Sequence, residues 1–343
     1  MSAIIGWDIG GVNTKVARIE HGTVRGAISE PFEIQYRRAD LPALLARLAV
    51  EMYAADDSLH AVTMTAELSQ LFRTKREGVS SILDAVAEAL PDARVRIYTV
   101  DGRFLTIEEA RQQPFTAAAS NWAATARVVA RTHPDAMLID VGTTTTDIIP
   151  IAGGEIAATG LTDADRLREC ELLYLGALRT PVEAITQEVP FRGGWAGVSA
   201  EGFAIAGDVY VWLGDLDTKD YTVATPDRRP VTRHFARERL ARIICADCEQ
   251  LADEEISAIA EHVAEAALTR VAASIARVQD RHPRIPIAIT TGLGEFLATR
   301  AAQRLGLRVT SLAAQLGPTA ARLAPAAAVA LLLEEAVATR TIA

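Results

Sequence analysis

A strand, a glycine-rich turn and a returning strand occur twice in this chain in the same register. The first copy covers residues 4–19 and the second is displaced by 132 residues, counting from Asp8 to Asp140. Five positions align: Asp8 with Asp140, Gly10 with Gly142, Thr14 with Thr146, Val16 with Ile148 and Gly22 with Gly154. Two unrelated hairpins would not share both turns at one offset, so the chain is predicted to contain two similar lobes, residues 1–132 and 133–343.

Further strands and helices alternate along both predicted lobes. Apolar runs predict strands at residues 23–25, 61–65, 95–100, 136–140, 147–151, 155–157, 285–290 and 308–312. Periodic patterns predict helices at residues 41–52, 80–90, 116–131, 236–277 (in two pieces), 295–305 and 325–338. Residues 186–235 are rich in glycine, proline and charge and are expected to form inserted loops. The alternation indicates an α/β fold with largely buried sheets.

Composition excludes several classes of partner. The net charge of −9 argues against nucleic acid or an anionic membrane surface as a partner. The longest apolar stretch near the C-terminus, residues 323–333, is shorter than a membrane span needs. Three cysteines form no disulfide framework, and the single pair with zinc-like spacing, Cys245 and Cys248, has no second pair to complete a site. We therefore expect a reduced, cytoplasmic protein with metal-free cysteines.

Each repeat ends a buried strand on an aspartate and then turns through glycine. Glycine lets backbone N–H groups approach a phosphate closely, and a carboxylate is a suitable ligand for a hydrated Mg²⁺. Two such turns facing one another would hold a polyphosphate, with Asp8 and Asp140 binding the metal. The alternative is two ordinary hairpin turns with surface carboxylates.

The turn motifs, Asp8-Ile-Gly-Gly and Asp140-Val-Gly-Thr-Thr-Thr-Thr-Asp147, resemble the two phosphate motifs of the actin / sugar-kinase / Hsp70-like superfamily. The second is most similar to the hydantoinase A / oxoprolinase branch. This resemblance implies two RNase H-like lobes with mixed sheets and a phosphate-binding cleft between them. The first motif departs from that branch, because Val12 replaces a threonine and Lys15 replaces an aspartate.

The lysine variant is similar to a narrower family, the methanofuran-biosynthesis synthases linked to tetrahydromethanopterin one-carbon transfer. Four short stretches carry the same resemblance: residues 64–68, 75–79, 121–122 and 208–210. The resemblance implies a transferase that joins an aminomethyl-furanmethanol diphosphate to the phenol oxygen of γ-glutamyltyramine and releases diphosphate. Its expected partners are therefore a small-molecule diphosphate and a phenolic acceptor, with Mg²⁺ or Mn²⁺ as the metal.

Roles for single residues follow from this chemistry. We expect the catalytic residues to be Asp8, Lys15, Asp140 and Asp147. Lys15 would stabilise the leaving diphosphate, and Asp147 would serve as the base for the phenol or as a second metal ligand. The expected substrate-binding residues are Gly10, Gly11, Asn13, Thr14, Lys75, Arg76, Asn121, Gly142, Thr143, Thr144, Thr145, Gly292 and Gly294.

Ordinary structural roles compete with several of these assignments. Lys15 could be a solvated hairpin lysine, Lys75 and Arg76 a charged helix face, and Asn121 a cap over a buried polar gap. The basic residues between 228 and 239 are more simply a solvated face than a lid over an anion.

The third glycine motif, residues 291–295, bears on nucleotide use. It opens a helix with Glu295 in the first turn, where a carboxylate repels an anion. This favours a substrate that carries its own diphosphate. The alternatives are an ATP-dependent hydantoinase-like hydrolase, a small-molecule kinase, or a non-catalytic actin-like nucleotide-binding protein. The oligomeric state and the exact acceptor are left open.

Overall fold

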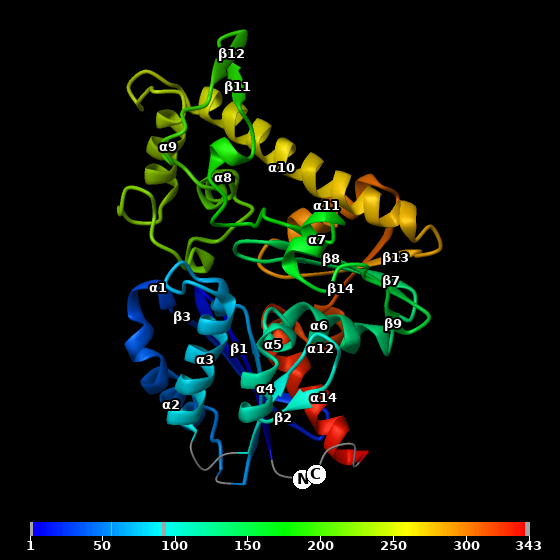
Figure 1. The fold of residues 1–343 in the computed structure, drawn as a ribbon. Helices are drawn as coiled ribbons and strands as arrows, with labels where there is room; N and C mark the ends of the chain where they lie inside the picture. Colours follow the sequence, from blue (N-terminus) through cyan, green and yellow to red (C-terminus); the bar gives the residue numbers. More distant parts are fainter. Residues whose placement is uncertain (1–2, 56, 91–93, 340–343) are drawn as a thin grey trace.

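The computed structural model describes residues 3–55, 57–90 and 94–339, which fold around two mixed β-sheets (Figure 1). The first sheet has the order β3-β2-β1-β4-β5-β6. Its strands are β1 (Ile4–Ile9), β2 (Asn13–Glu20), β3 (Thr23–Pro31), β4 (Leu59–Met64), β5 (Arg94–Tyr98) and β6 (Phe104–Leu105). Strand β1 pairs antiparallel with β2 and parallel with β4, so the first hairpin occupies the centre of the sheet.

The second sheet repeats this arrangement in the order β10-β8-β7-β13-β14, with β9 also paired to β8. Its strands are β7 (Ala136–Val141), β8 (Thr146–Ala152), β9 (Glu155–Ile156), β10 (Leu172–Leu173), β13 (Ile287–Thr291) and β14 (Arg308–Ser311). Strand β7 pairs antiparallel with β8 and parallel with β13, as β1 does with β2 and β4. The hairpin repeat predicted from the sequence is therefore present in the fold.

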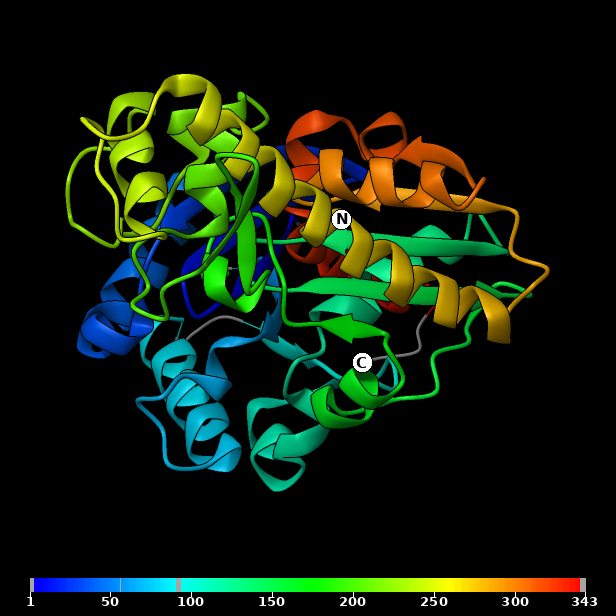
Figure 2. The same ribbon diagram turned by 90° about the horizontal axis from the view of Figure 1, so that it is seen from above.

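Helices cover the outer faces of both sheets. The outer layer of the first sheet contains α2 (Leu41–Glu51) and α3 (Lys75–Ala89), whose apolar sides meet strand residues such as Trp7 and Val62 in one core. On the second sheet, α10 (Asp253–Arg281) and α11 (Glu295–Arg304) pack side by side (Figure 2). The remaining short helices are α1 (Ile34–Arg37), α4 (Ile107–Gln112), α5 (Pro114–Ala117), α7 (Asp163–Arg168), α9 (Arg233–Arg242), α12 (Ala313–Leu316) and α13 (Pro318–Arg322).

Two helices, α6 (Asn121–Ala130) and α14 (Ala324–Ala338), form the layer between the two sheets. Helix α14 packs on β1, β2 and β4, whereas α6 contacts α14 and the strands of the second hairpin. One continuous core includes Ile4 and Ala61 of the first sheet, Leu138 and Ile149 of the second, and Val329 of α14. The two lobes are thus joined by a shared apolar layer.

Helix α14 belongs to the predicted second lobe, residues 133–343, but packs on strands of the first sheet. The end of the chain returns to the first sheet because the helix is lined with small residues, which allow close contact. A Cβ atom added to Gly6 would lie 2.0 Å from the carbonyl oxygen of Ala326. The first lobe is therefore completed by a helix distant in sequence.

Three predicted elements also differ. Residues 186–235 contain a hairpin, β11 (Glu188–Phe191) with β12 (Gly194–Gly197), and a buried helix, α8 (Ala206–Leu213), so they are not only loops. Helix α8 is buried almost throughout and is apolar apart from Asp208, so it lacks an amphipathic periodicity. Helix α3 begins at Lys75 and not at residue 80 as predicted, because the Thr74 hydroxyl caps it by accepting a hydrogen bond from the Glu77 N–H. The helix expected at residues 116–131 is interrupted before α6, where Ala119 has a φ of 48°.

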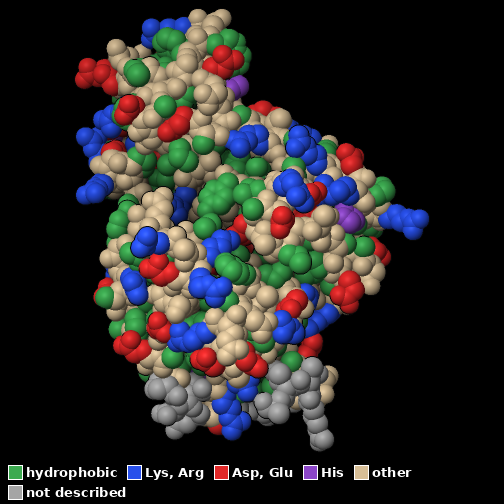
Figure 3. All heavy atoms as spheres, viewed as in Figure 1, with side chains coloured by type: hydrophobic (Ala, Val, Ile, Leu, Met, Phe, Trp, Pro, Cys, Tyr) green, Lys and Arg blue, Asp and Glu red, His purple; other side chains and the backbone are tan. Residues whose placement is uncertain are grey.

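The surface carries mixed charge. Figure 3 shows Lys and Arg side chains interspersed with Asp and Glu over the face it displays. Within the described part of the chain, no helix is both long and apolar enough to cross a bilayer.

Candidate active site

The two glycine turns have the same internal geometry. The Gly10 N–H donates to the Asn13 carbonyl at 3.0 Å, and the Gly142 N–H donates to the Thr145 carbonyl at 2.8 Å. The strand register places Lys15 opposite Asp8 and Asp147 opposite Asp140. Each turn therefore presents one carboxylate at the end of its first strand and one charged residue across from it.

Carbonyl groups of both turns are bound by neighbouring segments. Phe32 and Ile34 donate their N–H groups to Val12 and Gly11, at 2.8 and 3.3 Å. In the second turn, the Ala177 N–H donates to the Gly142 carbonyl at 2.9 Å. The Leu178 and Arg179 N–H groups both donate to Thr143, at 3.2 and 3.0 Å. Hydrogen bonds from neighbouring segments to these carbonyl groups therefore hold both turns in place.

The backbone N–H groups of the turns differ from the carbonyls in their hydrogen bonding. Those of Gly11 and Val12, and of the equivalent Thr143 and Thr144, bond to no acceptor within the described residues. Unpaired N–H groups in a glycine turn form an anion-binding concavity. The two turns are therefore candidate binding sites for a phosphorylated ligand.

Acidic side chains surround these turns. Asp8 is buried, its Oδ2 lies 3.4 Å from the Lys15 Nζ, and its Oδ1 has no hydrogen-bond partner. Burial raises the pKa of the Asp140 carboxyl to about 7; the charges of Asp147, Asp8 and Glu295 act in the same direction, and Lys15 acts against them. These charges act on Asp140 across the two hairpins, so the turns share one site.

The carboxylates Asp8 and Asp140 fit a divalent cation. Mutual repulsion and an unpartnered buried oxygen are relieved when a cation binds between carboxylates. Within the residues that the structure describes, no group of three His, Cys, Asp or Glu side chains is placed to hold a metal by itself. This agrees with Mg²⁺, which commonly takes one or two carboxylates together with water and substrate phosphates.

Asp147 has a partner that sequence reasoning missed. Its Oδ1 accepts a hydrogen bond from the Arg166 Nη2 at 2.6 Å. Burial raises the pKa of Asp147, and the Arg166 charge opposes that shift. The Arg166 guanidinium is itself buried, stacks 4.2 Å from the Trp122 ring centroid, and leaves its Nε unpartnered. The Arg166 charge is therefore balanced by Asp147, and the Trp122 ring packs against its guanidinium.

Lys75 meets the opposite lobe rather than open solvent. Its Nζ lies 2.6 Å from the Asp163 Oδ2 on α7, so the pair bridges the two lobes. Arg76 turns away from this pair, with its guanidinium 5.3 Å from the centroid of the Phe115 ring. Lys75 and Arg76, both predicted to bind substrate, therefore have different neighbours. Of the two, Lys75 contacts the opposite lobe.

A buried glutamate, Glu67, lies close enough to Lys75 and Asp163 to feel both charges. The sequence indicates it only as a member of residues 64–68, one of the stretches that resemble the synthase family. It belongs to the turn of 3₁₀ helix η2 (Ala66–Leu68), directly after β4. Both of its carboxylate oxygens are buried without a hydrogen-bond partner. Burial raises the pKa of Glu67 to about 7; the backbone N–H groups of Glu67 and Ala119 and the charge of Lys75 act against this shift, and the charge of Asp163 acts in the same direction.

Several of the buried polar atoms without a partner lie at this junction, and others lie elsewhere in the fold. Those at the junction belong to Asp8, Asn13, Thr14, Glu67 and Arg166. Buried polar groups are normally satisfied, so such a group calls for an explanation by ligand, water or ion. Asn121, the first residue of α6, lies nearby, because the preceding Ser120 Oγ is 2.7 Å from the hydroxyl of Thr63, the β4 partner of Asp8.

The third glycine motif supports the second turn. Gly292 has a φ of 94°, and a Cβ there would lie 2.3 Å from the Asp140 Oδ1. The Gly294 N–H already donates to the Val141 carbonyl at 2.8 Å. Gly292 and Gly294 therefore shape the site through close packing. Glu295 lines an adjoining cavity of about 240 Å³ that also contains Asp215, Asp217, Asp220 and Arg322.

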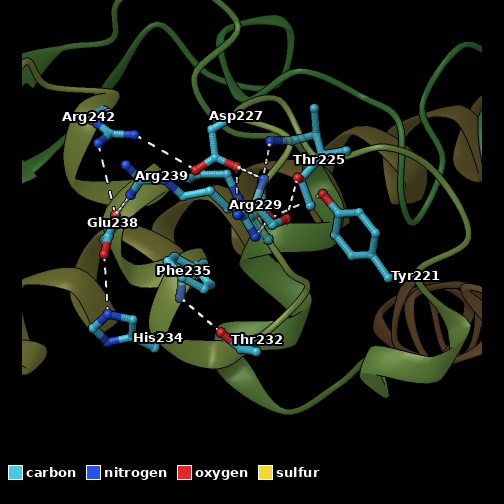
Figure 4. Close-up of polar contacts among 12 residues, drawn as sticks. Tyr221, Thr225, Asp227, Arg229, Thr232, His234, Phe235, Glu238, Arg239 and Arg242 are labelled. Atoms are coloured by element: carbon cyan, nitrogen blue, oxygen red, sulfur yellow. Dashed lines mark hydrogen bonds and ion pairs between the residues drawn. The ribbon is translucent and has the colours of Figure 1, made fainter.

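The basic run between residues 228 and 239 is largely exposed, as expected for a solvated face, but Arg239 is buried, and several of its members join an ion-pair network (Figure 4). Arg239 is fully buried and pairs with Asp208 at 2.8 Å and Asp227 at 3.1 Å. Arg229 pairs with Glu238, and the His234 Nε2 lies 3.2 Å from the same carboxylate. The network joins α8 to α9, which explains the Asp208 stretch as a structural feature.

Comparison with known proteins assigns the chain. The model of the hydantoinase/oxoprolinase family matches residues 58–336. The chain belongs to the hydantoinase/oxoprolinase family. Among its relatives is a synthase from Methanocaldococcus jannaschii, (4-{4-[2-(gamma-L-glutamylamino)ethyl]phenoxymethyl}furan-2-yl)methanamine synthase, 36% identical over 334 residues, 97% of this chain and 98% of the relative. A protein of the same name from Methanococcus vannielii is 33% identical over 202 residues, 58% of this chain and 90% of the relative.

The fold of this chain is also similar to that of solved structures. A nucleotide-free acetone carboxylase matches with a TM-score of 0.58 at 9% identity, covering 89% of this chain and 68% of that one. A ROK family glucokinase from Streptomyces griseus, in complex with glucose and AMPPNP, matches with a TM-score of 0.51 at 12% identity, covering 96% and 98%. These likenesses confirm the expected actin-like, sugar-kinase-like architecture.

Proposed function

We propose that this enzyme joins an aminomethyl-furanmethanol diphosphate to the phenol oxygen of γ-glutamyltyramine, with release of diphosphate, in the biosynthesis of a methanofuran-type cofactor. The observation that carries the proposal is the similarity to the M. jannaschii synthase over almost the full length of both chains. The paired turns add a physical reason, because they offer two sets of free N–H groups for two phosphates.

The chain's own residues would bind and stabilise the departing diphosphate. The furan ring stabilises positive charge on its exocyclic carbon, so the C–O bond breaks readily and the barrier depends on the leaving group. Lys15 and the turn amides at Gly11 and Thr143 would stabilise the charge that develops there. Asp8 and Asp140 would hold Mg²⁺, which when bound supplies neutralising charge at the diphosphate.

Asp147 remains a candidate base for the phenol or a second metal ligand. Its hydrogen bond to the buried Arg166 favours the ionised carboxylate. That contact also fixes the carboxylate toward Arg166, which supports an electrostatic role in the second lobe. Gly10, Asn13, Thr14, Thr145, Lys75 and Asn121 would complete the binding surface.

The test is an assay with purified enzyme, Mg²⁺, furanmethanol diphosphate and γ-glutamyltyramine, without nucleotide. We expect the ether product and free diphosphate in equal amounts. Asp8→Asn and Asp140→Asn should each abolish turnover, whereas Asp280→Asn, at an exposed position on α10, should retain it. Product that appears only with ATP, together with ADP, would contradict the proposal and favour a hydantoinase-like hydrolase or a kinase.

A further inference from the structure

The buried carboxylate of Glu67 has no role in the chemistry described so far. The side chain is 1% exposed, and neither oxygen has a hydrogen-bond partner. Burying a carboxylate without partners costs several kcal/mol, so the surrounding structure must hold it there. A residue kept at such a cost, in a cluster with other unpartnered groups, is a candidate for function.

The local packing fixes Glu67 at the edge of the site. The Thr65 N–H donates to the Ile9 carbonyl at 3.0 Å, which ties the start of this segment to the end of β1. On the other side, a Cβ at Gly78 would lie 2.3 Å from the Glu67 carbonyl oxygen, so α3 rests directly on its backbone. The first contact therefore ties the Glu67 segment to the strand end that precedes the first turn, and the second packs it against α3.

The charged groups that act on Glu67 come from both lobes. Lys75 lies on α3 of the first lobe and Asp163 on α7 of the second. Asp163 also acts electrostatically on Asp147. The carboxylate thus lies at the junction of the lobes, where a substrate bound between them would approach it.

We propose that Glu67 accepts the proton of the phenolic hydroxyl when the acceptor attacks. This inference rests on the proposed function and names the proton acceptor for it. The contrast with Asp147 supports it, because Asp147 already accepts a hydrogen bond from a buried arginine, whereas the Glu67 carboxylate has no hydrogen bond to another side chain.

The step balances as a substitution. The hydroxyl proton passes to a carboxylate oxygen of Glu67, and the phenol oxygen forms a C–O bond to the exocyclic CH₂ of the furan. The electron pair of the breaking C–O bond leaves with diphosphate. Glu67 then returns the proton to solvent. Burial brings the pKa of Glu67 to about 7, closer to that of a phenol than an exposed carboxyl would be, which favours proton transfer.

Access to Glu67 requires the lobes to separate. The Lys75–Asp163 ion pair, with side chains 28% and 19% exposed, joins the lobes next to it. The acceptor phenol would therefore displace this pair as it enters. Removing the pair is not part of the test, because Lys75 is also a candidate phosphate ligand.

The test compares wild type, Glu67→Gln and the control Glu88→Gln, whose glutamate is exposed on α3. Each protein is assayed with γ-glutamyltyramine and with a ring-fluorinated analogue whose phenol ionises below neutral pH. With the natural acceptor, we expect Glu67→Gln to lower kcat by roughly 10²- to 10³-fold. With the fluorinated acceptor the loss should shrink to less than about tenfold, because that phenol needs no base. The control should match wild type with both.

The pH profile provides a second readout. Wild-type kcat should rise with pH as Glu67 loses its proton and then level off, whereas Glu67→Gln should lack this rise. An equal loss with both acceptors, or an unchanged kcat, would overturn the role of Glu67 while leaving the proposed function intact. Absence of ether from the wild type with either acceptor would contradict the proposed function itself, and the role of Glu67 with it.

Discussion

Lys15 and Asp147 occupy equivalent positions in the two hairpins but carry opposite charges. Each lies across from a metal-binding candidate, Asp8 or Asp140, in the antiparallel register. Lys15 offsets the charge of Asp8 in the first lobe, whereas Asp147 requires Arg166 to offset its own in the second. The charges are therefore balanced beside the first turn, whereas the second turn has two carboxylates, Asp140 and Asp147, for the one cation Arg166, so the two turns present different charge to a bound diphosphate.

Replacing Lys15 tests its role at the leaving group. Lys15→Ala should lower kcat by roughly 10²-fold and change KM less, because the contact strengthens as charge develops on diphosphate. Lys15→Arg should restore little, since a planar fork does not replace a compact ammonium in a tight turn. Steady-state kinetics would measure both, with Lys219→Ala at an exposed site as the control. A rise in KM with unchanged kcat would contradict this role.

The buried carboxyl of Glu67 predicts a dependence of the protein's stability on pH. Its pKa is raised to about 7 in the fold, so the folded state holds the proton more tightly than the unfolded chain. The contribution of the protonated Glu67 to the free energy of unfolding is fully present below the ordinary glutamate pKa. It is lost as pH rises through about 7, where the buried carboxyl ionises. At higher pH the cost is on the order of 3 kcal/mol.

Glu67→Gln removes this titration. The variant should therefore become more stable relative to wild type as pH rises from acid to mildly alkaline values. Chemical denaturation across that range measures the difference in the free energy of unfolding. A difference that stays constant with pH would show that Glu67 is ionised equally in both states.

At the scale of elements, two close approaches position the site. Helix α14 lies against β1 at Gly6, and the loop after β13 lies against β7 at Gly292. Both contacts bring backbone to backbone, so any side chain there pushes the elements apart. The strand ends that carry Asp8 and Asp140 depend on these contacts for their placement.

A methyl group at Gly6 tests the first contact. The added Cβ would lie 2.0 Å from the Ala326 carbonyl oxygen, so Gly6→Ala should destabilise the protein by at least about 1–3 kcal/mol. Gly26→Ala on β3 is a matched control, because its Cβ would make an ordinary 3.7 Å contact with Met52. Thermal unfolding of both variants checks the difference. Equal melting temperatures would mean that α14 can shift without cost.

At the scale of the whole molecule, the two ends of the chain cooperate in one lobe. The first sheet is formed by the N-terminal part of the chain, but its inner face is covered by α14. The same helix contacts α6, which packs on the second hairpin. Helix α14 therefore couples the packing of the first sheet to a segment far along the chain.

Fragments test this coupling. A protein of residues 1–132 should lack cooperative unfolding, because Ile4, Ile19 and Ala61 would lose their cover. Joining residues 1–132 to residues 313–343 through a flexible linker should restore it. Near-ultraviolet circular dichroism and thermal scans would compare the two, with a fusion carrying the C-terminal residues in shuffled order as the control. Cooperative unfolding of residues 1–132 alone would contradict the role of α14.

The sequence by itself determined the features that depend on local order along the chain. Strand alternation, glycine turns and a constant offset specified both hairpins, and the register then placed Asp8 and Asp140 at equivalent strand ends. The motifs also indicated the family. These properties are local because a strand end and the turn that follows are neighbours in the chain.

Tertiary structure alone decided which distant groups meet. Arg166 reaches Asp147, Lys75 reaches Asp163, and Arg239 is buried with Asp208, although nothing local in the sequence pairs them. The position of α14 and the burial of α8 likewise depend on the faces that neighbouring elements offer. Burial and long-range charge set the state of Glu67, because a carboxylate has an ordinary pKa until the fold removes its water and brings other charges close.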